Sequence, residues 1–378
     1  MSQKNCRDML CGILKYAYEH TNWVIHRTPL LYRKSMGFKE MLSDLYDWEP
    51  DGIIMDCGDF PHEIYNAGTP LVVGANVRNT PKDAYHLMDN SDAIAQKATD
   101  YLLEQGFRRF AYCGIDQDWS YTRGEAFAEK VKEAGFDVSI FKHVRKNIDY
   151  SWKQEQDNLT EWLKSLELPT ALFTCNDDRA EEIITTCKSI GLKIPEDIAI
   201  LGVDNDNLLC ETIGPKLSSI GFFAEKSGYK LAEILDKLMN GIKVEQKVVM
   251  TNPSHIATRQ STEITAIDDY FVAEALNFIH NNFNKYTQVQ DVADFVGTSS
   301  GELRRRFKTA LNRSIQHELT RCRVNFISKM LIETDMSVSQ IATKLGYPAQ
   351  AKYITRFFQK ETGMSPFEYK NRFKKTLS

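Results

Sequence analysis

The chain has 378 residues, of which 42% are apolar and 26% carry a charge. That balance is typical of folded globular proteins and excludes a disordered or fibrous chain, and the length suggests two or three domains. The net charge of −4 hides a contrast. Residues 268–378 contain 17 Lys and Arg against 11 Asp and Glu, a net of +6, which leaves 47−17 = 30 basic and 51−11 = 40 acidic side chains, a net of −10, elsewhere. A basic segment on an acidic body indicates that one domain meets a polyanion.

The start of the chain and its cysteines favour a cytoplasmic protein. Residues 1–10 lack the apolar core of a signal peptide, and no run approaches the roughly 18 apolar residues of a membrane span. The eight cysteines are scattered, form no CxxC motif and have no histidine pair at zinc spacing near them. We therefore expect buried, reduced thiols, no metal, no cofactor and no membrane partner.

Up to about residue 250, short apolar runs alternate with helix-length amphipathic stretches, which is the pattern of an α/β fold with parallel sheets. The expected strands cover residues 23–28, 52–55, 70–73, 109–113, 138–141, 170–174, 198–203 and 217–220. The expected helices include residues 93–105, 122–134, 155–166 and 178–190. Glycines directly after three of these helices fit the left-handed position that commonly ends a helix, namely Gly106, Gly135 and Gly191.

Polar side chains gather directly after the expected strands, where ligands bind in parallel sheets. A carboxylate accepts hydrogen bonds from two hydroxyls, an amide both donates and accepts, and an indole offers an apolar face to a sugar ring. The set therefore predicts a polyhydroxylated ligand, although Asp and Asn at such positions also cap the next helix. The residues are Asp89-Asn90, Asp116 to Trp119, Asn176-Asp177-Asp178 and Asp204-Asn205-Asp206.

Motifs of catalysis are missing from the sequence. No glycine-rich phosphate loop follows a strand, no GxSxG elbow occurs, and the histidines show no HExxH or HxH spacing. We therefore expect no enzyme. A sugar-modifying enzyme built on the Asp and Asn cluster is kept as an alternative, but it would lack a nucleophile–base pair.

Several segments resemble the effector domain of LacI/GalR-type regulators. They are Arg123-Gly124 with Phe127, Asn176-Asp177, the stretch from Ile194 to Asn205, and Leu217 to Ile220. The resemblance implies a periplasmic-binding-protein-like fold of two lobes over residues 1–259, with a sugar held between the lobes. By matching positions, it implies that the hydroxyls are bound by Arg123, Asn176 and Asp204. The weaker candidates are Asp89, Asn90, Trp119 and Asp177.

One element departs from that family. The family's first element is a strand inside the sheet, whereas residues 7–18 here already have the apolar face of a helix, made by Met9, Leu10, Ile13, Leu14 and Ala17. The first strand-like run, 23–28, corresponds to the family's second strand. A sheet without an interior strand would leave backbone groups unpaired. We therefore expect a short apolar strand to be encoded upstream, which the in-frame upstream sequence would reveal.

Beyond residue 260 the pattern changes. Residues 260–267 are polar and indicate a linker, and every strong pattern in the domain 268–378 is helical. After a helix over 268–283, two units repeat a short helix, a glycine turn and a second helix; the second helices cover 299–311 and 349–362. The repeat predicts two helix-turn-helix units, joined by a helix over 315–332.

Helical geometry selects the residues that face DNA. Leu303 and Phe307 must face the core, so Arg305 points directly away from it, with Arg304 and Arg306 on either side. Arginine can pair bidentately with guanine, and flanking basic side chains anchor phosphates. A solvated basic face is the alternative, but two helix-turn-helix units and the charge contrast favour DNA. The candidate DNA-contacting residues are Ser299, Ser300, Arg304, Arg305, Lys308, Gln350, Lys352, Thr355 and Arg356.

The second unit resembles the signature of AraC/XylS-type regulators. The matching residues are 339–342, Gly346-Tyr347-Pro348, Arg356-Phe357-Phe358, Gly363-Met364-Ser365-Pro366 and Tyr369. The resemblance implies a seven-helix domain with two recognition helices in successive major grooves, roughly 34 Å apart, and Arg305 and Arg356 at base-reading positions. One residue more than the usual spacing precedes Tyr353, so we rely on Arg356 more than on Gln350 or Lys352.

The order of a LacI-type sensor followed by an AraC-type DNA reader resembles that of xylose-operon regulators as a family. It implies a pentose such as xylose as the effector, and activation rather than repression. We expect a homodimer that binds double-stranded DNA half-sites, works with RNA polymerase and shifts between two arrangements when the lobes close on the sugar. A regulator of the same architecture with a non-sugar effector is the alternative.

Overall fold

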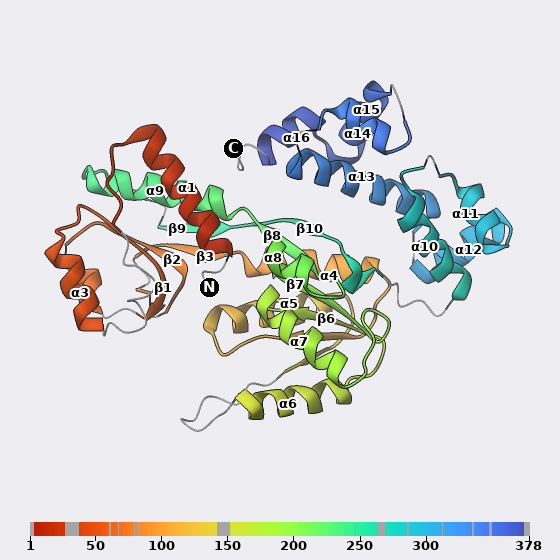
Figure 1. Ribbon diagram of the computed structural model, residues 1–378, viewed down its shortest axis with the longest axis horizontal. Coiled ribbons are helices and arrows are strands. Elements are labelled where there is room, and N and C mark those ends of the chain that lie inside the picture. The colour runs from red at the N-terminus through yellow and green to blue at the C-terminus, as the bar shows by residue number, and fades with distance from the viewer. Residues whose placement is uncertain are drawn as a thin grey trace. The chain divides into compact units, whose positions relative to one another are not determined.

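The computed structural model describes residues 4–26, 38–59, 62–66, 68–78, 80–81, 84–141, 152–245, 247–263, 269–285, 287–311, 313–334, 336–347 and 350–373. The chain divides into two compact units, and Figure 1 labels their helices and strands. The first unit combines Met1–Ala95, Asp116–Ala126 and Gly221–His255. The second combines Gln96–Ile115, Phe127–Ile220 and Ile256–Ser378.

The first unit is built on a four-stranded sheet with the order β1-β2-β3-β9, in which neighbouring strands run parallel. The strands are β1 (Ile53–Asp59), β2 (Leu71–Arg78), β3 (Tyr85–Asp89) and β9 (Val248–Thr251). The helical elements are α1 (Lys4–His20), α3 (Phe38–Asp47), η1 (His62–Asn66) and α9 (Ala224–Met239). Helices α1 and α9 share one apolar cluster with the sheet, in which Ile13 and Leu231 meet Val72 and Leu87.

Two glycines let α1 and α9 approach each other closely, and Figure 1 shows the two helices side by side. A Cβ atom on Gly12 would lie 1.9 Å from the backbone oxygen of Glu225. A Cβ atom on Gly228 would lie 2.0 Å from the backbone oxygen of Met9. Because both obstacles are backbone atoms, a side chain at either glycine would force the helices apart.

Two expectations for the start of the chain are wrong. Residues 21–26 form no strand, and the ring of Trp23 instead packs near Tyr16, with ring centroids 6.0 Å apart; Arg27 and Thr28 lie outside the described residues. Within α1, Leu14 is 46% exposed, whereas Tyr16 is buried. The Tyr16 hydroxyl donates to Asp236 of α9 at 3.0 Å, a contact that an argument from apolar periodicity does not find.

The second unit is built on a six-stranded sheet with the order β10-β8-β7-β6-β4-β5. The pairs β4–β5, β4–β6 and β6–β7 are parallel, and the four strands β4, β6, β7 and β8 are buried along their whole length. The strands are β4 (Phe110–Cys113), β5 (Val138–Ile140), β6 (Thr170–Thr174), β7 (Ile198–Asp204), β8 (Ser218–Phe222) and β10 (Pro253–Ala257). The helices are α4 (Ser91–Glu104), α5 (Asp118–Glu133), α6 (Trp152–Ser165), α7 (Asp177–Ser189) and α8 (Asn207–Thr212), of which α4 and α5 begin in the first unit.

The α/β fold class with parallel sheets is confirmed, as are most of the expected elements. Seven of the eight expected strands correspond to β1, β2, β4, β5, β6, β7 and β8, and the four expected helices correspond to α4, α5, α6 and α7. Gly106, Gly135 and Gly191 have φ angles of +93°, +89° and +78°, as the helix ends require. Strands β3, β9 and β10 were not expected: β9 has only four residues, and β3 and β10 mix apolar residues with His, Asp and Ser.

The helical region confirms the two expected helix-turn-helix units. Its described residues form seven helices: α10 (Tyr270–Asn282), α11 (Val289–Val296), α12 (Ser300–Leu311), α13 (Ile315–Glu333), α14 (Val338–Lys344), α15 (Ala351–Thr362) and α16 (Pro366–Phe373). Two separate apolar cores hold them, one around Leu303 and Phe307 and the other around Ile354 and Phe358. Helix α13 contributes to both cores and joins the units.

The first part of the expected linker is folded into the second unit. Gln260–Thr262 form the 3-10 helix η2, and both Ser261 and Thr262 are fully buried. The Ser261 hydroxyl donates to the backbone oxygen of Ile200 at 2.6 Å and accepts from the backbone N–H of Ser218 at 2.8 Å. The polar composition of this stretch therefore reflects buried hydrogen bonds rather than solvation. Residues 264–268 lie outside the described residues.

The expectation of buried thiols holds for part of the cysteines. The buried free thiols are Cys113, Cys175, Cys187 and Cys210, whereas Cys11 is exposed. Burial raises the pKa of the Cys113 thiol to about 12, so that it stays protonated and unreactive. Among the residues that the structure describes, no helix is both long and apolar enough to cross a membrane.

Candidate functional site

The first candidate group centres on Arg123 of α5, which is 2% exposed. Its guanidinium donates to Asp89 Oδ2 at 2.8 Å. The ring centroid of Trp119 lies 5.1 Å from the guanidinium carbon, and that of Phe222 lies 5.6 Å from it. Three of these residues were expected from the sequence, whereas Phe222, the last residue of β8, was not. The structure therefore brings Arg123, Asp89 and Trp119 together in the first unit.

The ion pair of Arg123 and Asp89 is held in dry surroundings. Burial raises the pKa of Asp89, and the charge of Arg123 opposes that rise. Hydrogen bonds are electrostatically stronger in such a low-dielectric environment than in water. A paired charge beside two aromatic rings can therefore orient a ligand that carries both hydroxyls and an apolar ring face.

Two candidate amides cap helices, as the alternative interpretation held. Asn90 Oδ1 accepts from the backbone N–H of Ala93 at 3.0 Å, and its Nδ2 donates to Asn252 at 2.9 Å. Asn176 Oδ1 accepts from the backbone N–H of Arg179 at 3.0 Å and so caps α7. Any ligand contact of these amides would be additional to their capping role.

Asp177 faces the interior of the second unit. It is 1% exposed, its Oδ1 accepts from Ser219 Oγ at 2.6 Å, and its Oδ2 accepts from the backbone N–H of Asp206 at 2.7 Å. Gly202 makes room for it, because a Cβ atom there would lie 2.2 Å from Asp177 Oδ1. Burial raises the pKa of Asp177 to about 7, although the hydrogen bonds oppose the rise. These contacts give its carboxylate a structural role inside the lobe.

The end of β7 combines strained backbone with a buried polar oxygen. Asp204 has a φ of +112° and Asn205 one of +49°, values that residues other than glycine rarely adopt. Both residues are at most 9% exposed. The Asn205 N–H donates to Ser219 Oγ at 2.9 Å, whereas its Oδ1 is buried with no hydrogen-bond partner among the described residues. Leaving such an atom unsatisfied costs about 1–3 kcal/mol, so this position suits a ligand hydroxyl. The sequence placed both residues in the polar set that follows this strand, but assigned hydroxyl binding to Asp204 and not to Asn205.

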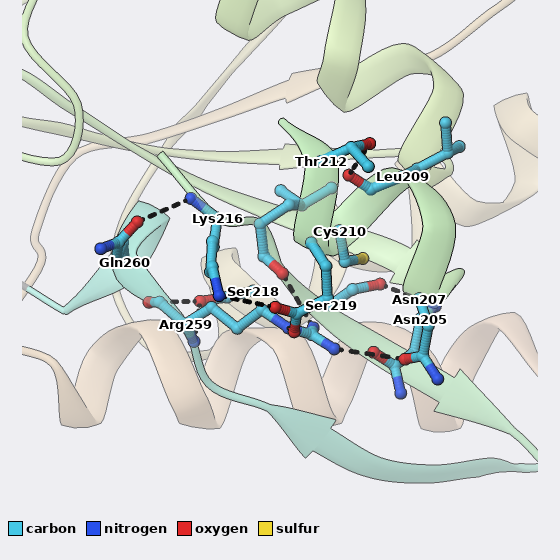
Figure 2. A network of polar contacts seen from close by, with 12 residues as sticks. Asn205, Asn207, Leu209, Cys210, Thr212, Lys216, Ser218, Ser219, Arg259 and Gln260 are labelled. Carbon is cyan, nitrogen blue, oxygen red and sulfur yellow. Dashed lines mark hydrogen bonds and ion pairs between the residues drawn. The ribbon is translucent and has the colours of Figure 1, made fainter. Parts of the chain in front are cut away.

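Figure 2 shows the polar network beside this position. The Arg259 side chain donates to Glu211 at 2.8 Å and to the backbone oxygen of Leu217 at 2.9 Å. The Ser218 hydroxyl donates to the backbone oxygen of Arg259 at 2.8 Å and accepts from Thr262 Oγ1 at 2.6 Å. The network fastens η2, the last described element before α10, to strand β8.

In the first helix-turn-helix unit, Arg305 is exposed on α12 as expected. Its side chain is paired on its own helix, since Nε and Nη2 donate to the two carboxylate oxygens of Glu302 at 3.0 and 2.7 Å. The hydrogen bond from Arg305 is the main cause that lowers the pKa of Glu302 to about 2. Arg306, which the sequence suggests for phosphates, pairs with Asp269 at 2.9 Å, and its guanidinium carbon lies 4.9 Å from the ring centroid of Phe271. Glu302 thus orients the guanidinium that the sequence assigns to base reading.

The other candidates near α12 are of two kinds: two serines whose hydroxyls have local partners, and two exposed basic residues. Ser299 Oγ accepts from the backbone N–H of Glu302 at 3.2 Å. Ser300 Oγ donates to Gln290 of α11 at 2.6 Å. Arg304 and Lys308 are exposed. The two serines therefore fix the start of the helix, and the basic residues offer charge to phosphates.

The second candidate recognition helix, α15, presents fewer basic residues. The exposed candidates at its start and along it are Gln350, Lys352 and Arg356. Thr355 is half-buried, and its hydroxyl donates back into its own helix. Tyr353, which the sequence did not single out, is 46% exposed and stacks between Tyr347 and Phe357, with centroids 5.1 and 6.2 Å away. This aromatic ladder gives the exposed face a rigid edge.

One group of side chains has the composition of a metal site. The ligand atoms of His280, Glu318 and Cys322 lie within 4.8 Å of one another. However, Glu318 accepts hydrogen bonds from Arg313 at 2.8 Å and from Arg321 at 2.5 Å. Two guanidinium groups occupy the carboxylate oxygens and repel a cation, so the group is an ion-pair cluster.

Comparisons with known proteins identify two domains in the chain. A model of the periplasmic binding protein-like domain matches residues 99–262, and a model of a helix-turn-helix domain matches residues 292–372. The chain is thus a DNA-binding transcription regulator in which a periplasmic-binding-protein-like sensor precedes an AraC-type helix-turn-helix domain.

The relatives narrow this class. The chain is 29% identical to the xylose operon regulatory protein of Haemophilus influenzae over 331 residues, which cover 85% of this chain and 84% of that protein. It is 27% identical to the protein of the same name from Escherichia coli over 344 residues, or 88% and 87% of the two chains. The solved structure of a xylose-binding transcription activator, XylR, has the same fold, with a TM-score of 0.59, 24% identity and coverage of 98% and 96%. The chain is therefore similar to xylose operon regulatory proteins across both of its domains.

Proposed function

We propose that a pentose, D-xylose or a close relative, is the effector of this regulator and that its binding activates transcription. The observation that carries the proposal is the similarity to xylose operon regulatory proteins across both domains, over 85% of the chain. The buried pair of Arg123 and Asp89, with two aromatic rings near the guanidinium, supports a sugar rather than a charged effector.

We assign the hydroxyl contacts to two pairs of residues. Arg123 donates and Asp89 accepts in the first unit, and Trp119 offers a ring face beside them. In the second unit Asp204 accepts, and the buried Oδ1 of Asn205 gains a donor from the ligand. Asn90, Asn176 and Asp177 are left to their capping and interior roles.

The remaining parts of the proposal concern partners. A homodimer would place two copies of α12 and α15 on adjacent half-sites of double-stranded DNA. Arg305 and Arg356 would read bases, with Arg304, Lys308 and Lys352 on phosphates and Ser299, Ser300, Gln350 and Thr355 nearby. An activator in this arrangement contacts RNA polymerase, and its work lies in the cytoplasm, where the DNA is.

Calorimetry with D-xylose, L-arabinose, D-glucose and D-xylose 5-phosphate tests the effector. We expect D-xylose to bind, and Asp204→Ala to weaken binding by about 10- to 100-fold, since a hydrogen bond to a charged group contributes about 1.5–3 kcal/mol. Operator binding without sugar should stay unchanged. Asp157→Ala, at an exposed carboxylate on α6, is the control and should bind D-xylose like the unaltered protein.

Two results would count against the proposal. If the unaltered protein binds none of the four sugars, the effector is not of this class. If D-xylose binds Asp204→Ala with undiminished affinity, the hydroxyl contacts lie elsewhere.

A further inference from the structure

A cluster around Glu318, near the start of α13, contains more basic than acidic side chains. Glu318 is fully buried and accepts from His280 Nε2 at 3.0 Å, Arg313 Nε at 2.8 Å and Arg321 Nη2 at 2.5 Å. Burial would raise the pKa of Glu318, but the hydrogen bond from His280 and the charges of the arginines outweigh burial and hold it far below its usual range. One carboxylate thus faces two guanidinium groups.

The cluster therefore carries a surplus of positive charge. The side chains of Arg313 and Arg321 are only 10% and 15% exposed, so water screens them poorly. Arg313 Nη2 is buried and has no acceptor among the residues that the structure describes. A second source of negative charge beside these arginines would offset the surplus.

The C-terminal turn of α4 supplies that charge from the sensor lobe of the same unit. Glu104 Oε2 lies 3.6 Å from Arg321 Nη1. The amide oxygen of Gln105, oriented toward the arginine, accepts from both terminal nitrogens of Arg321 at 3.2 Å. Gln105 is 1% exposed, and a helix C-terminus adds partial negative charge of its own. The end of α4 therefore matches the arginine pair in charge and in hydrogen-bonding capacity.

The same turn of α4 is tied to the polar network near the effector residues. The Tyr101 hydroxyl is within hydrogen-bond distance of Thr262 Oγ1, at 2.6 Å, and Thr262 Oγ1 donates to Ser218 Oγ at 2.6 Å. The next residue along β8, Ser219, accepts from the N–H of Asn205 at 2.9 Å. Hydrogen bonds and one turn of helix thus connect the strained end of β7 with Arg321.

We propose that the C-terminal turn of α4, from Tyr101 to Gln105, is a docking surface for Arg313, just before α13, and Arg321 of α13. This surface couples the effector site to the DNA-binding domain. The coupling part rests on the proposed function, whereas the docking part does not. A ligand hydroxyl that binds Asn205 changes the conformation at the end of β7. The hydrogen-bond network shifts η2 and Tyr101 in turn, and this changes the contact between the α4 turn and Arg321. The docking surface is thus a two-state contact that both sites bias.

The contact is weak enough to serve this purpose. Glu104 is 48% exposed, and an exposed ion pair contributes about 0–1 kcal/mol. Such a contact shifts an equilibrium between domain arrangements without deciding whether either domain folds. Altering the lobe side leaves Glu318 and its partners intact, whereas removing Arg321 would take two hydrogen bonds from the buried carboxylate of Glu318.

Hydrogen exchange on the full chain tests the docking without any sugar. Glu104→Lys places a cation against Arg321, so amides in residues 101–106 and 315–322 should exchange about two- to fivefold faster. The control, Glu133→Lys, makes the same charge change on the same lobe at a residue paired only with Lys130 among the described residues, and should leave both segments unchanged. Unaltered exchange in Glu104→Lys overturns the docking.

Operator binding with and without D-xylose tests the coupling. The operator used is a DNA site that the unaltered protein selects from a random library. In Glu104→Lys the change in operator affinity caused by D-xylose should fall by about threefold or more, while calorimetry shows D-xylose still binding. A response equal to that of Glu133→Lys overturns the coupling. If the unaltered protein does not respond to D-xylose, the proposed function fails, and the exchange experiment still decides the docking.

Discussion

Asp177 lies shortly after β6 and Asp204 is the last residue of β7, yet the two carboxylates have different surroundings. Asp177 is enclosed by Ser219 and the backbone of Asp206. Asp204 lies on strained backbone beside a buried, unsatisfied oxygen of Asn205. The first environment stabilises the lobe, and the second one is suited to a ligand.

The raised pKa of Asp177 predicts how stability depends on pH. In the unfolded chain its pKa is about 3.9, whereas burial raises it to about 7 in the folded protein. Between these values the folded state holds a proton that the unfolded state has lost, so this residue lowers stability as pH rises from about 4 to about 7. Asp177→Asn lacks that titration. Its stability relative to the unaltered protein should rise across this window by up to a few kcal/mol, at about 1.36 kcal/mol per unit of pKa.

Urea unfolding followed by circular dichroism at several pH values measures this difference. Asp157→Asn, at an exposed position of α6, should show a pH profile parallel to that of the unaltered protein. A constant offset between Asp177→Asn and the unaltered protein from pH 4 to pH 7 would contradict the assignment.

Only part of the candidate site could be predicted at the scale of residues. The rule that polar residues follow strands found Asp89, Trp119, Asn176, Asp177 and Asp204, but a helix cap and a ligand contact require the same residue types at that point. Their separation depends on which hydrogen bonds are already made. Asn205 was found with its neighbours but given no role of its own. Phe222 and Glu302 escaped notice because their roles come from contacts between residues far apart in the sequence or on different faces of one helix.

At the scale of elements, the crossing of α1 and α9 predicts an intolerant glycine. Gly12→Ala would place its Cβ atom against the backbone oxygen of Glu225, which cannot yield as a flexible side chain does. We expect a loss of about 1–3 kcal/mol of unfolding free energy, the usual cost of overpacking, measured by urea unfolding. Gly301→Ala in α12 is the control, because nothing lies within 4 Å of its added Cβ atom. It should be neutral or stabilising by up to about 1 kcal/mol; equal effects of the two substitutions would refute the close crossing.

Elements with strong periodicity were predictable, and weakly patterned ones were not. The helices of the DNA-binding domain have regular apolar spacing and glycine ends, so α12 and α13 were placed to within one residue of their bounds. Strand β9 is too short to stand out, and β3 and β10 mix apolar with polar residues. Residues 23–28 have a strand-like composition, but the aromatic packing of Trp23 on Tyr16 prevailed over that preference.

At the scale of the whole molecule, the split of charge into a net of −10 and a net of +6 predicts that salt affects DNA binding strongly and sugar binding little. Operator binding should weaken by about 10³- to 10⁵-fold between 50 and 200 mM salt if 6–10 phosphates are contacted. Binding of D-xylose, an uncharged sugar, should change by less than about twofold. Fluorescence anisotropy and calorimetry in the same buffers measure both. A flat salt profile for operator binding would place the basic surface outside the DNA interface.

The buried position of η2 determines where the sensor of such a regulator can be fused to another DNA-binding domain. A sensor grafted onto another reader is usually cut where composition turns polar, which here is at Gln260. A junction there would remove Ser261 and Thr262 from the sensor lobe. The hydroxyl of Ser218 and the phenol of Tyr101 would then lose hydrogen-bond partners. A chimaera that keeps a working sensor should therefore be joined after Glu263. The DNA-binding domain that is joined to it should place arginines opposite the end of α4.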